Sequence, residues 1–282
     1  MQTFNFSEPN SVHGVNMQTL TIPRRHKFSY LMFVKNEASH IGYVIDTMVN
    51  DADEIIISDN KSTDGTSEII QRYANQHHNV KHLINNSPST QQRWLDVLDQ
   101  ASNHYCVFMS GHDLCLPSSI HNMLDIMANN LDLVHVAPKN VIKVDLNYTI
   151  QEFYKHPLSN DDLMSDSPLV RMKILARKFG DGAMFYGLYR KDILTRIIYH
   201  FPFPELEAVN PLFMGTDHSC INIVAQAGKI ALCDKSLFFR LTHQSMIPDN
   251  DYSLYKLFTI LTVYYSTLLI TPPLPLHLLA RC

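Results

Sequence analysis

The chain has 282 residues, of which 45% are hydrophobic and 18% charged, so it is long enough for one large domain or one bilobal unit. Its net charge of -4 gives no bulk attraction to nucleic acid, which we do not expect as a partner. The five cysteines form no Cys-x-x-Cys pair, which argues against structural zinc. Cys106 and Cys220 lie in apolar patterns and are predicted to be buried thiols in a reducing compartment.

Residues 1–28 form a polar lead-in without an apolar core of signal-peptide length, so we expect no secretion signal and a cytoplasmic protein. After it, short apolar runs alternate with stretches of helical periodicity. The pattern predicts strands over 29–35, 53–59, 80–84, 105–109 and 133–137, and helices over 37–50, 65–76, 90–101 and 117–129. Such alternation is typical of an α/β fold with a mostly parallel sheet flanked by helices. The first half of this fold should cover residues 29–137.

The second half, residues 138–252, is less regular. Residues 138–182 lack a clear period, and we interpret them as connecting and acceptor-side structure. The pattern then predicts strands over 183–188, 229–233 and 237–241, and helices over 190–199 and 216–227. The last segment, 253–282, is apolar, but its longest run is shorter than the about 20 residues that cross a membrane. It fits a helix packed on the core or an interfacial helix in peripheral contact with the membrane.

The most specific pattern in the chain lies near its first two predicted strands. It comprises Val34-Lys35-Asn36-Glu37, then Asp53-Glu54-Ile55-Ile56-Ile57, then Asp59-Asn60-Lys61-Ser62-Thr63-Asp64-Gly65-Thr66. These sequences resemble the opening of a family-2 glycosyltransferase with the GT-A fold. The resemblance covers about residues 29–243. It implies a nucleotide-diphosphate sugar donor, a UDP-sugar in the first place, and transfer with inversion to a hydroxyl of a glycan or lipid-linked acceptor.

The resemblance implies a donor site at the carboxyl ends of the first strands. Asp59 would contact the base, although it could also be a turn-forming aspartate. Asp64 is better explained as a helix N-cap than as a ligand. The loop Lys35-Asn36-Glu37 would bind the donor largely through its backbone. The resemblance places Arg93 near the phosphates or the base, and the planar, always charged guanidinium suits this task. Alternatively, Arg93 is a solvent-exposed arginine on a helix without such a role.

Ser110-Gly111-His112-Asp113 follows the apolar strand 105–109, where family members usually carry Asp-x-Asp for a metal ion. Ser110 and His112 replace two aspartates, and only Asp113 remains. Asp113 together with the donor diphosphate could still hold Mn²⁺ or Mg²⁺. His112 could be a second ligand suited to Mn²⁺, a protonated side chain that offsets phosphate charge, or a residue without a role. His243 is a further candidate ligand of the metal or the phosphate.

Gly215-Thr216-Asp217-His218 resembles the helix start at which the family places its catalytic base. Asp217 would accept the proton of the acceptor hydroxyl during attack on the anomeric carbon. A helix cap is a compatible alternative for Asp217, and His218 is a weaker candidate base. Asp181, Tyr186 and Arg190 are expected on the acceptor side.

Two other functions remain open on the sequence alone. The altered metal motif would suit a non-catalytic nucleotide-sugar-binding protein, but the presence of Arg93, Asp113 and Asp217 together argues for an enzyme. A nucleotidyltransferase would carry a glycine-rich phosphate loop after the first strand, and Lys35-Asn36-Glu37 has no glycine. By analogy with the family, we expect a role in surface polysaccharide biosynthesis, at the inner face of the membrane if residues 253–282 touch it.

Overall fold

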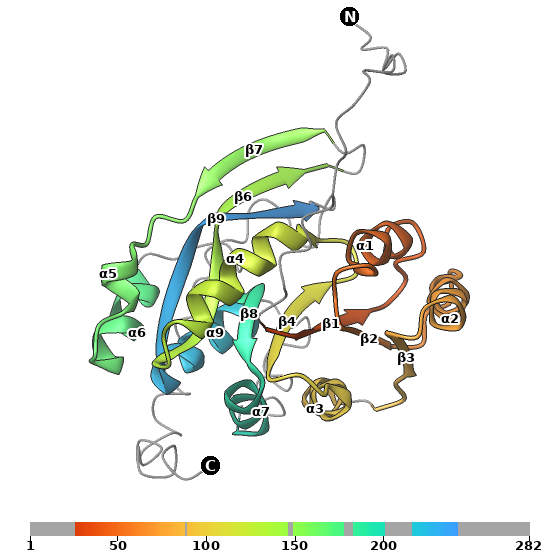
Figure 1. Ribbon diagram of the computed structural model, residues 1–282, viewed down its shortest axis with the longest axis horizontal. Coiled ribbons are helices and arrows are strands. Elements are labelled where there is room, and N and C mark those ends of the chain that lie inside the picture. Colours follow the sequence, from red (N-terminus) through yellow and green to blue (C-terminus); the bar gives the residue numbers. More distant parts are fainter. Residues whose placement is uncertain (1–25, 88, 146–148, 178–182, 201–215, 242–282) are drawn as a thin grey trace, which may run out of the picture.

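The computed structural model describes residues 26–87, 89–145, 149–177, 183–200 and 216–241 (Figure 1). The nine strands in these ranges form one sheet with the order β3-β2-β1-β4-β8-β6-β9-β5, and β7 pairs with β6. The predicted lead-in up to residue 25 and the apolar segment 253–282 lie outside the described residues. Among the helices of the described ranges, none combines the length and the apolar character that crossing a membrane requires.

The first half of the chain contributes one block of parallel strands. Its strands are β1 (Phe28–Val34), β2 (Glu54–Asp59), β3 (Val80–Ile84) and β4 (Tyr105–Ser110). Its helices are α1 (Ile41–Met48), α2 (Thr66–Gln76), α3 (Thr90–Gln100) and α4 (Pro117–Ala128). β1 lies parallel to β2 and β4, and β2 lies parallel to β3. The predicted alternation of strands and helices is therefore confirmed.

The remaining strands complete the sheet and run in both directions. They are β5 (Leu114–Cys115), β6 (Leu133–Val144), β7 (Ile150–Lys155), β8 (Gly187–Arg190) and β9 (Lys229–Leu241). The remaining helices are α5 (Asn160–Leu163), α6 (Pro168–Arg177), η1 (Ala183–Phe185), α7 (Lys191–His200) and α9 (Thr216–Ala227). β6 is parallel to β9, whereas β5, β7 and β8 are antiparallel to their neighbours.

Several boundary predictions are wrong, each for a local reason. The irregular structure expected over 138–182 is instead the rest of β6, the β6–β7 hairpin, α5 and α6. β6 continues through Pro138, which stands beside a register shift between β6 and β9, where a residue without an N–H is tolerated. The strand expected over 183–188 begins only at Gly187, after η1.

Two further predictions differ at polar residues. The strands expected over 229–233 and 237–241 are one strand, β9, in which Asp234 and Lys235 are exposed and interrupt the apolar pattern. The helix expected from residue 37 begins at Ile41, and a turn over 38–40 precedes it.

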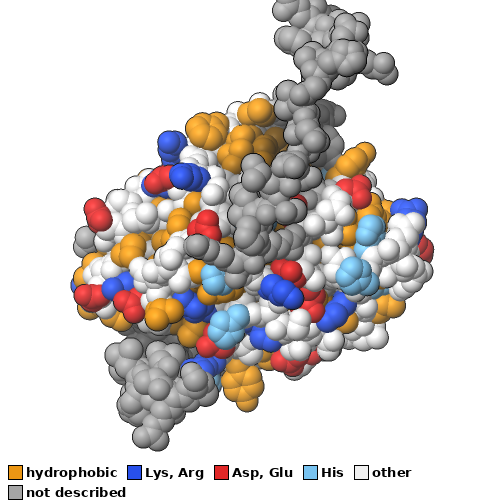
Figure 2. Space-filling model, viewed as in Figure 1, with side chains coloured by type: hydrophobic (Ala, Val, Ile, Leu, Met, Phe, Trp, Pro, Cys, Tyr) orange, Lys and Arg blue, Asp and Glu red, His pale blue; other side chains and the backbone are white. Residues whose placement is uncertain are grey.

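An apolar layer covers each face of the sheet. On one face, Phe28, Tyr30 and Met32 of β1 pack with α1, α2 and α4 (Figure 1). On the other face, Leu31 and Phe108 pack with helices that include α3, α7 and α9. Cys106 and Cys220 are buried reduced thiols, as predicted. On the face of the molecule that Figure 2 shows, acidic and basic side chains are interspersed among hydrophobic ones.

The parallel strands place three loops at one edge of the sheet. Val34 at the end of β1 lies opposite Asp59 at the end of β2. Phe33 lies opposite Ser110 at the end of β4. In sheets of this type, ligands bind outside the carboxyl ends of the strands, so this edge is where a functional site is expected.

Candidate functional site

The loops after β1 and β2 are hydrogen-bonded to each other. Asn36 has a φ of 57°, a left-handed conformation that asparagine tolerates better than most residues. Its N–H donates to Ser62 Oγ at 2.8 Å, and its Oδ1 accepts from the N–H of Thr63 at 2.9 Å. The N–H of Glu37 donates to Thr66 Oγ1 at 2.7 Å. The Ser-Thr-Asp-Gly-Thr sequence therefore fixes the shape of the neighbouring loop.

Asp64 also joins the loop after β1 to the loop after β2. Its Oδ1 accepts from the N–H of Thr66 at 3.1 Å and its Oδ2 from the N–H of Ala38 at 3.0 Å. Asp64 was predicted to be the N-cap of α2, and this prediction is wrong. The N-cap is Gly65, whose φ of 97° suits glycine. Asp64 stands one residue too early for the cap position, and it joins the loop after β1 to the start of α2.

Asp59 is buried at the end of β2, with 1% of its surface exposed. Its Oδ1 accepts from the N–H of Ser62 at 3.0 Å and from the Ser62 hydroxyl at 2.6 Å. Its Oδ2 lies 4.0 Å from Nε2 of His82 on β3. One oxygen thus forms the turn, as the alternative interpretation required. The described hydrogen bonds assign the base contact to neither oxygen, and that role stays a prediction.

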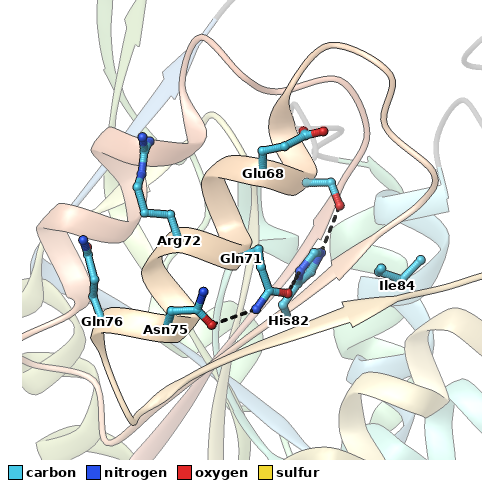
Figure 3. A pocket seen from close by; sticks show the side chains of 8 residues that line it. Glu68, Gln71, Arg72, Asn75, Gln76, His82 and Ile84 are labelled. Atoms are coloured by element: carbon cyan, nitrogen blue, oxygen red, sulfur yellow. Dashed lines mark hydrogen bonds between the residues drawn. The ribbon is translucent and has the colours of Figure 1, made fainter.

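A hollow lies beside His82, between α2 and β3 (Figure 3). His82 Nδ1 lies 3.2 Å from Gln71 Oε1, and its Nε2 lies 3.5 Å from Ser67 Oγ. Burial lowers the pKa of His82 even though the charge of Asp59 opposes this effect. The other residues that line the hollow are Glu68, Arg72, Asn75, Gln76 and Ile84.

Arg93 is engaged in the loop before α3. Its Nη1 donates to the carbonyl of Ser87 at 2.8 Å, and its Nη2 donates to Thr90 Oγ1 at 2.6 Å. These contacts shape the loop, and its predicted contact with the nucleotide stays a prediction. Trp94, which follows Arg93, stacks on Phe185 with ring centroids 5.4 Å apart.

The loop after β4 is compact and held to β9. The N–H of Asp113 donates to Ser110 Oγ at 3.0 Å, and Asp113 Oδ1 accepts from the N–H of Leu241 at 2.9 Å. A Cβ on Gly111 would lie 2.7 Å from Val34 Cγ1 and 3.0 Å from Glu37 Cγ. Only a residue without a side chain lets this loop approach the loop after β1 so closely.

At this close approach, His112 contacts Glu37. Nδ1 of His112 lies 2.7 Å from Glu37 Oε1, and its Nε2 lies 4.0 Å from Asp113 Oδ1. Burial alone would lower the pKa of His112, but the hydrogen bond to Glu37 and the charges of Asp113 and Glu37 outweigh it, so the pKa is raised. This contact between Glu37 and His112 was not predicted from the sequence. The available signal was that both residues follow neighbouring parallel strands.

The residues at this edge fit a divalent ion with two protein ligands. In the part of the chain that the structure describes, no group of three or more His, Cys, Asp or Glu side chains could hold a metal ion. Asp113 and His112 Nε2 are nevertheless adjacent, and metal ions of nucleotide enzymes often take few protein ligands and several phosphate oxygens. A carboxylate with an imidazole suits Mn²⁺ better than Mg²⁺. His243 lies outside the described residues.

Of the expected acceptor-side residues, the structure describes Tyr186 and Arg190, which lie near opposite ends of β8. Tyr186 lies just before β8 at the carboxyl end of β4, and its ring stacks on Phe238 of β9 with centroids 5.3 Å apart. Arg190 lies at the other end, opposite Tyr105, because β8 is antiparallel to β4. Its guanidinium donates to the carbonyl groups of Met127, Asn130 and Leu133. Arg190 therefore lies away from the carboxyl edge of the parallel strands, and its acceptor-side role stays a prediction.

Asp217 lies in the first turn of α9, whose bounds are those predicted from the sequence. Only the backbone of Asp217 and His218 belongs to the described part of the chain, so their roles stay predictions. Asp181 lies outside the described residues. Lys35 is described and exposed.

Comparison with known proteins identifies relatives of this chain. Residues 29–198 match the family model described as Glycosyl transferase family 2. The GalNAc(5)-diNAcBac-PP-undecaprenol beta-1,3-glucosyltransferase of Campylobacter jejuni is 26% identical over 159 residues, which are 55% of this chain and 48% of that protein. The chain thus spans about half the length of the curated relative that it matches.

Solved structures resemble this fold at low sequence identity. S. aureus TarS 1–349 in complex with UDP-GlcNAc matches with a TM-score of 0.52 and 15% identity, over 78% of this chain and 59% of that chain. The mannosyltransferase PcManGT from Pyrobaculum calidifontis, in complex with GDP-Man and Mn²⁺, matches with a TM-score of 0.53 and 13% identity, over 86% and 64%. These likenesses concern the fold, and they confirm the predicted GT-A architecture.

Proposed function

The chain belongs to glycosyl transferase family 2, and from this premise we propose that it transfers a sugar from a nucleotide-diphosphate donor to an acceptor hydroxyl, with inversion. One observation carries the proposal: the loops after β1, β2 and β4 are bonded together at the carboxyl edge of the sheet. This arrangement gathers Asp59, Glu37, His112 and Asp113 at the edge where such folds bind ligands.

The donor would occupy this edge. Asp59 would accept an N–H of the base through Oδ2, since Oδ1 is already bonded to Ser62. The loop of Lys35, Asn36 and Glu37 would contact the nucleoside, and Ser110 and Gly111 would lie under the diphosphate. Arg93 would reach a phosphate or the base from the first turn of α3. A UDP-sugar is the first candidate, supported by the UDP-GlcNAc complex of the structural neighbour TarS.

Asp113 and His112 would hold a divalent ion, Mn²⁺ in preference to Mg²⁺. When bound, the ion offsets the charge that develops on the departing diphosphate. His243 is proposed as a further ligand. The Mn²⁺ complex of the structural neighbour PcManGT supports a metal ion in this family.

Asp217 would act as the general base from the start of α9. It would accept the proton of the acceptor hydroxyl while that oxygen attacks the anomeric carbon from the face opposite the phosphate. A single displacement of this kind inverts the anomeric centre. Tyr186 and Asp181 would face the acceptor, the former from the carboxyl end of β4.

We propose a lipid-linked glycan as the acceptor and surface polysaccharide biosynthesis as the setting. The name of the C. jejuni relative, which specifies an undecaprenol diphosphate-linked glycan, supports this class. The same proposal includes work at the inner face of the membrane, with peripheral contact through residues 253–282.

The replacement of two aspartates by Ser110 and His112 favours a second candidate, a nucleotide-sugar-binding protein without transferase activity. The test is a thermal-unfolding panel with UDP-, GDP-, CDP- and TDP-sugars, each with and without Mn²⁺. A ligand present at 100 times its Kd stabilises the native state by about 2.7 kcal/mol. We expect the largest rise in Tm with a UDP-sugar and Mn²⁺.

The panel is followed by an assay of donor turnover with a lipid-linked acceptor. Absence of a Tm rise with every nucleotide sugar contradicts both candidates. Binding without release of nucleoside diphosphate, with or without acceptor, supports the second candidate against the first.

A further inference from the structure

We propose that Glu37 is a positioning residue that holds the His112 ring with its proton on Nδ1 and so presents Nε2 as a ligand to the divalent ion. The inference rests on the proposed function, because it assumes that a metal-dependent donor site exists at this edge. In this proposal the side chain of Glu37 orients His112, whereas the loop of Lys35, Asn36 and Glu37 contacts the nucleoside.

The first support is the contact itself. The 2.7 Å separation of His112 Nδ1 and Glu37 Oε1 is that of a strong hydrogen bond to a charged group. The acceptor is a carboxylate, so Nδ1 must be the donor. Nε2, at the opposite side of the ring, is then the nitrogen directed toward Asp113 at 4.0 Å.

The second support is that Glu37 has little freedom to leave. Its backbone N–H is bonded to Thr66 Oγ1, and its carbonyl accepts from the N–H groups of His40 and Ile41, both at 2.9 Å. Its side chain is 14% exposed and that of His112 is 22% exposed. Gly111 brings the His112 loop so close that a Cβ there would meet Glu37 Cγ at 3.0 Å. The pair is therefore enclosed and geometrically fixed.

The third support is the chemistry of histidine ligands. A histidine that binds a metal commonly donates its other ring N–H to a carboxylate, which fixes the tautomer and makes the ligating nitrogen more basic. Glu37 thereby adds a negative charge behind the His112 ring, at a site where Asp113 is the carboxylate beside Nε2.

A different arrangement makes a distinct prediction. If His112 acts as a protonated cation, both ring nitrogens carry protons and Nε2–H donates to the diphosphate. Mn²⁺ would then bind without displacing a proton from His112. The state of Nε2 in the presence of Mn²⁺ or a diamagnetic substitute separates the two arrangements.

The experiment measures Mn²⁺ affinity by electron paramagnetic resonance, with UDP present, for Glu37→Ala, His112→Ala and the double variant. Loss of a supporting carboxylate typically weakens metal binding by about 10- to 100-fold, and we expect this for Glu37→Ala. The double variant should bind Mn²⁺ no more weakly than His112→Ala, because Glu37 acts only through His112. His40→Gln is the matched control. His40 lies 3.6 Å from the other Glu37 oxygen, and this variant should stay within about twofold of the wild type.

Two readouts keep the inference testable if a variant fails to fold. In the wild-type protein with Mg²⁺ and UDP, ¹⁵N NMR of His112 should show a protonated Nδ1 and an unprotonated Nε2; a protonated Nε2 overturns the inference. Equal Mn²⁺ affinity of Glu37→Ala and wild type also overturns it. UDP affinity without metal is measured separately: if the wild type binds UDP but not Mn²⁺, the inference fails alone, and if it does not bind UDP, the proposed function fails.

Discussion

Asp113 Oδ1 accepts a hydrogen bond from the backbone N–H of Leu241 at 2.9 Å, across a sequence separation of 128 residues. Asp113 ends the loop after β4, and Leu241 is the last residue of β9. The bond therefore holds the end of β9 against the loop that carries the proposed metal ligands.

Because of this bond, two variants of Asp113 can distinguish the effect of its charge from its structural role. Asp113→Asn keeps an oxygen that can accept from Leu241 but removes the carboxylate charge. We expect kcat to fall by more than about 100-fold, because loss of a ligand should cost more than loss of a supporting group. Asp113→Ala should in addition lower the free energy of unfolding by about 1–3 kcal/mol, since the Leu241 N–H loses its partner. Urea unfolding and donor turnover of both variants check this, and wild-type turnover of Asp113→Asn contradicts it.

Asp59 has two oxygens with two proposed tasks, and two variants distinguish them. Asp59→Ala should weaken UDP binding by about 1.5–3 kcal/mol, the value of a hydrogen bond to a charged group. Ser62→Ala is the comparison variant: it removes the hydroxyl that donates to Oδ1 at 2.6 Å and accepts from the N–H of Asn36 at 2.8 Å, and it leaves the Asp59 carboxylate in place. We expect Ser62→Ala to bind UDP nearly as well as the wild type in calorimetry. Equal losses in both variants would mean that Asp59 acts through the turn, and unchanged affinity in Asp59→Ala would remove it from the site.

Asp217 is the proposed general base, and Asp217→Asn retains its shape and its capacity to cap α9. Removal of a positioned base typically lowers the rate by about 10²–10⁴-fold, so kcat should fall by this factor while UDP affinity stays near that of the wild type. Steady-state kinetics with saturating donor provide the test, with His218→Ala assayed in parallel. A wild-type rate for Asp217→Asn would leave it only a cap, and His218 or Asp181 would then be the residues to examine.

Gly187 and Gly42 should respond to alanine with opposite signs. A Cβ on Gly187 would lie 2.5 Å from the Val136 carbonyl oxygen and 2.9 Å from His135 Cε1, so Gly187→Ala should destabilise the fold by about 1–3 kcal/mol. Gly42 lies in α1, and a Cβ there would be no closer than 3.7 Å to Tyr73 Oη. Gly42→Ala should stabilise the protein by about 0.5–1 kcal/mol through helix propensity. Urea unfolding of both variants measures the signs, and a stable Gly187→Ala would show that the sheet can shift.

His156 should make the protein sensitive to mild acid. Burial, followed by the charges of Lys139 and Arg240, lowers the pKa of His156 to about 4. An unfolded chain with a histidine pKa near 6.5 takes up this proton first, so the free energy of unfolding should decrease as pH falls from about 6.5 toward 4. The expected slope is up to about 1.4 kcal/mol per pH unit for this one group.

His156→Phe tests this assignment, because Nε2 of His156 has no hydrogen-bond partner in the described structure. The variant should lose part of the acid sensitivity between pH 7 and pH 5 in urea unfolding. His135 has a pKa lowered to about 4 by burial, but its ring nitrogens lie 3.0 Å from the Leu188 carbonyl oxygen and 2.8 Å from that of Met184. His135→Phe should therefore destabilise the fold at both pH values. An unchanged pH profile in His156→Phe assigns the effect elsewhere.

Local pattern was enough to predict most elements of the fold. The bounds of β3 over 80–84 and of α9 over 216–227 agree with the prediction, because a short apolar run and a helical spacing can each be recognised from neighbouring residues. The turn at Asp59 was also predictable from its Ser, Thr, Asp and Gly neighbours.

What the sequence could not predict depends on which strands become neighbours. Periodicity predicted a strand over 183–188, which overlaps β8 only at its start. It could not predict that β8 lies between β4 and β6 and runs antiparallel to both. That direction moves Arg190 away from the candidate site. The Glu37–His112 contact depends on the same kind of non-local fact, the pairing of β1 with β4.

The place of β8 in the sheet has a consequence for synthesis on the ribosome. β1 to β4 leave the exit tunnel first and can pair among themselves, but β4 keeps one edge without a neighbour until Gly187–Arg190 has been made. That edge belongs to an apolar strand, and unpaired apolar edges attract other chains. While β6, β7, α5 and α6 are translated, the unpaired edge of β4 can therefore associate with other chains. The edge is covered only when β8, a strand of four residues, pairs with it.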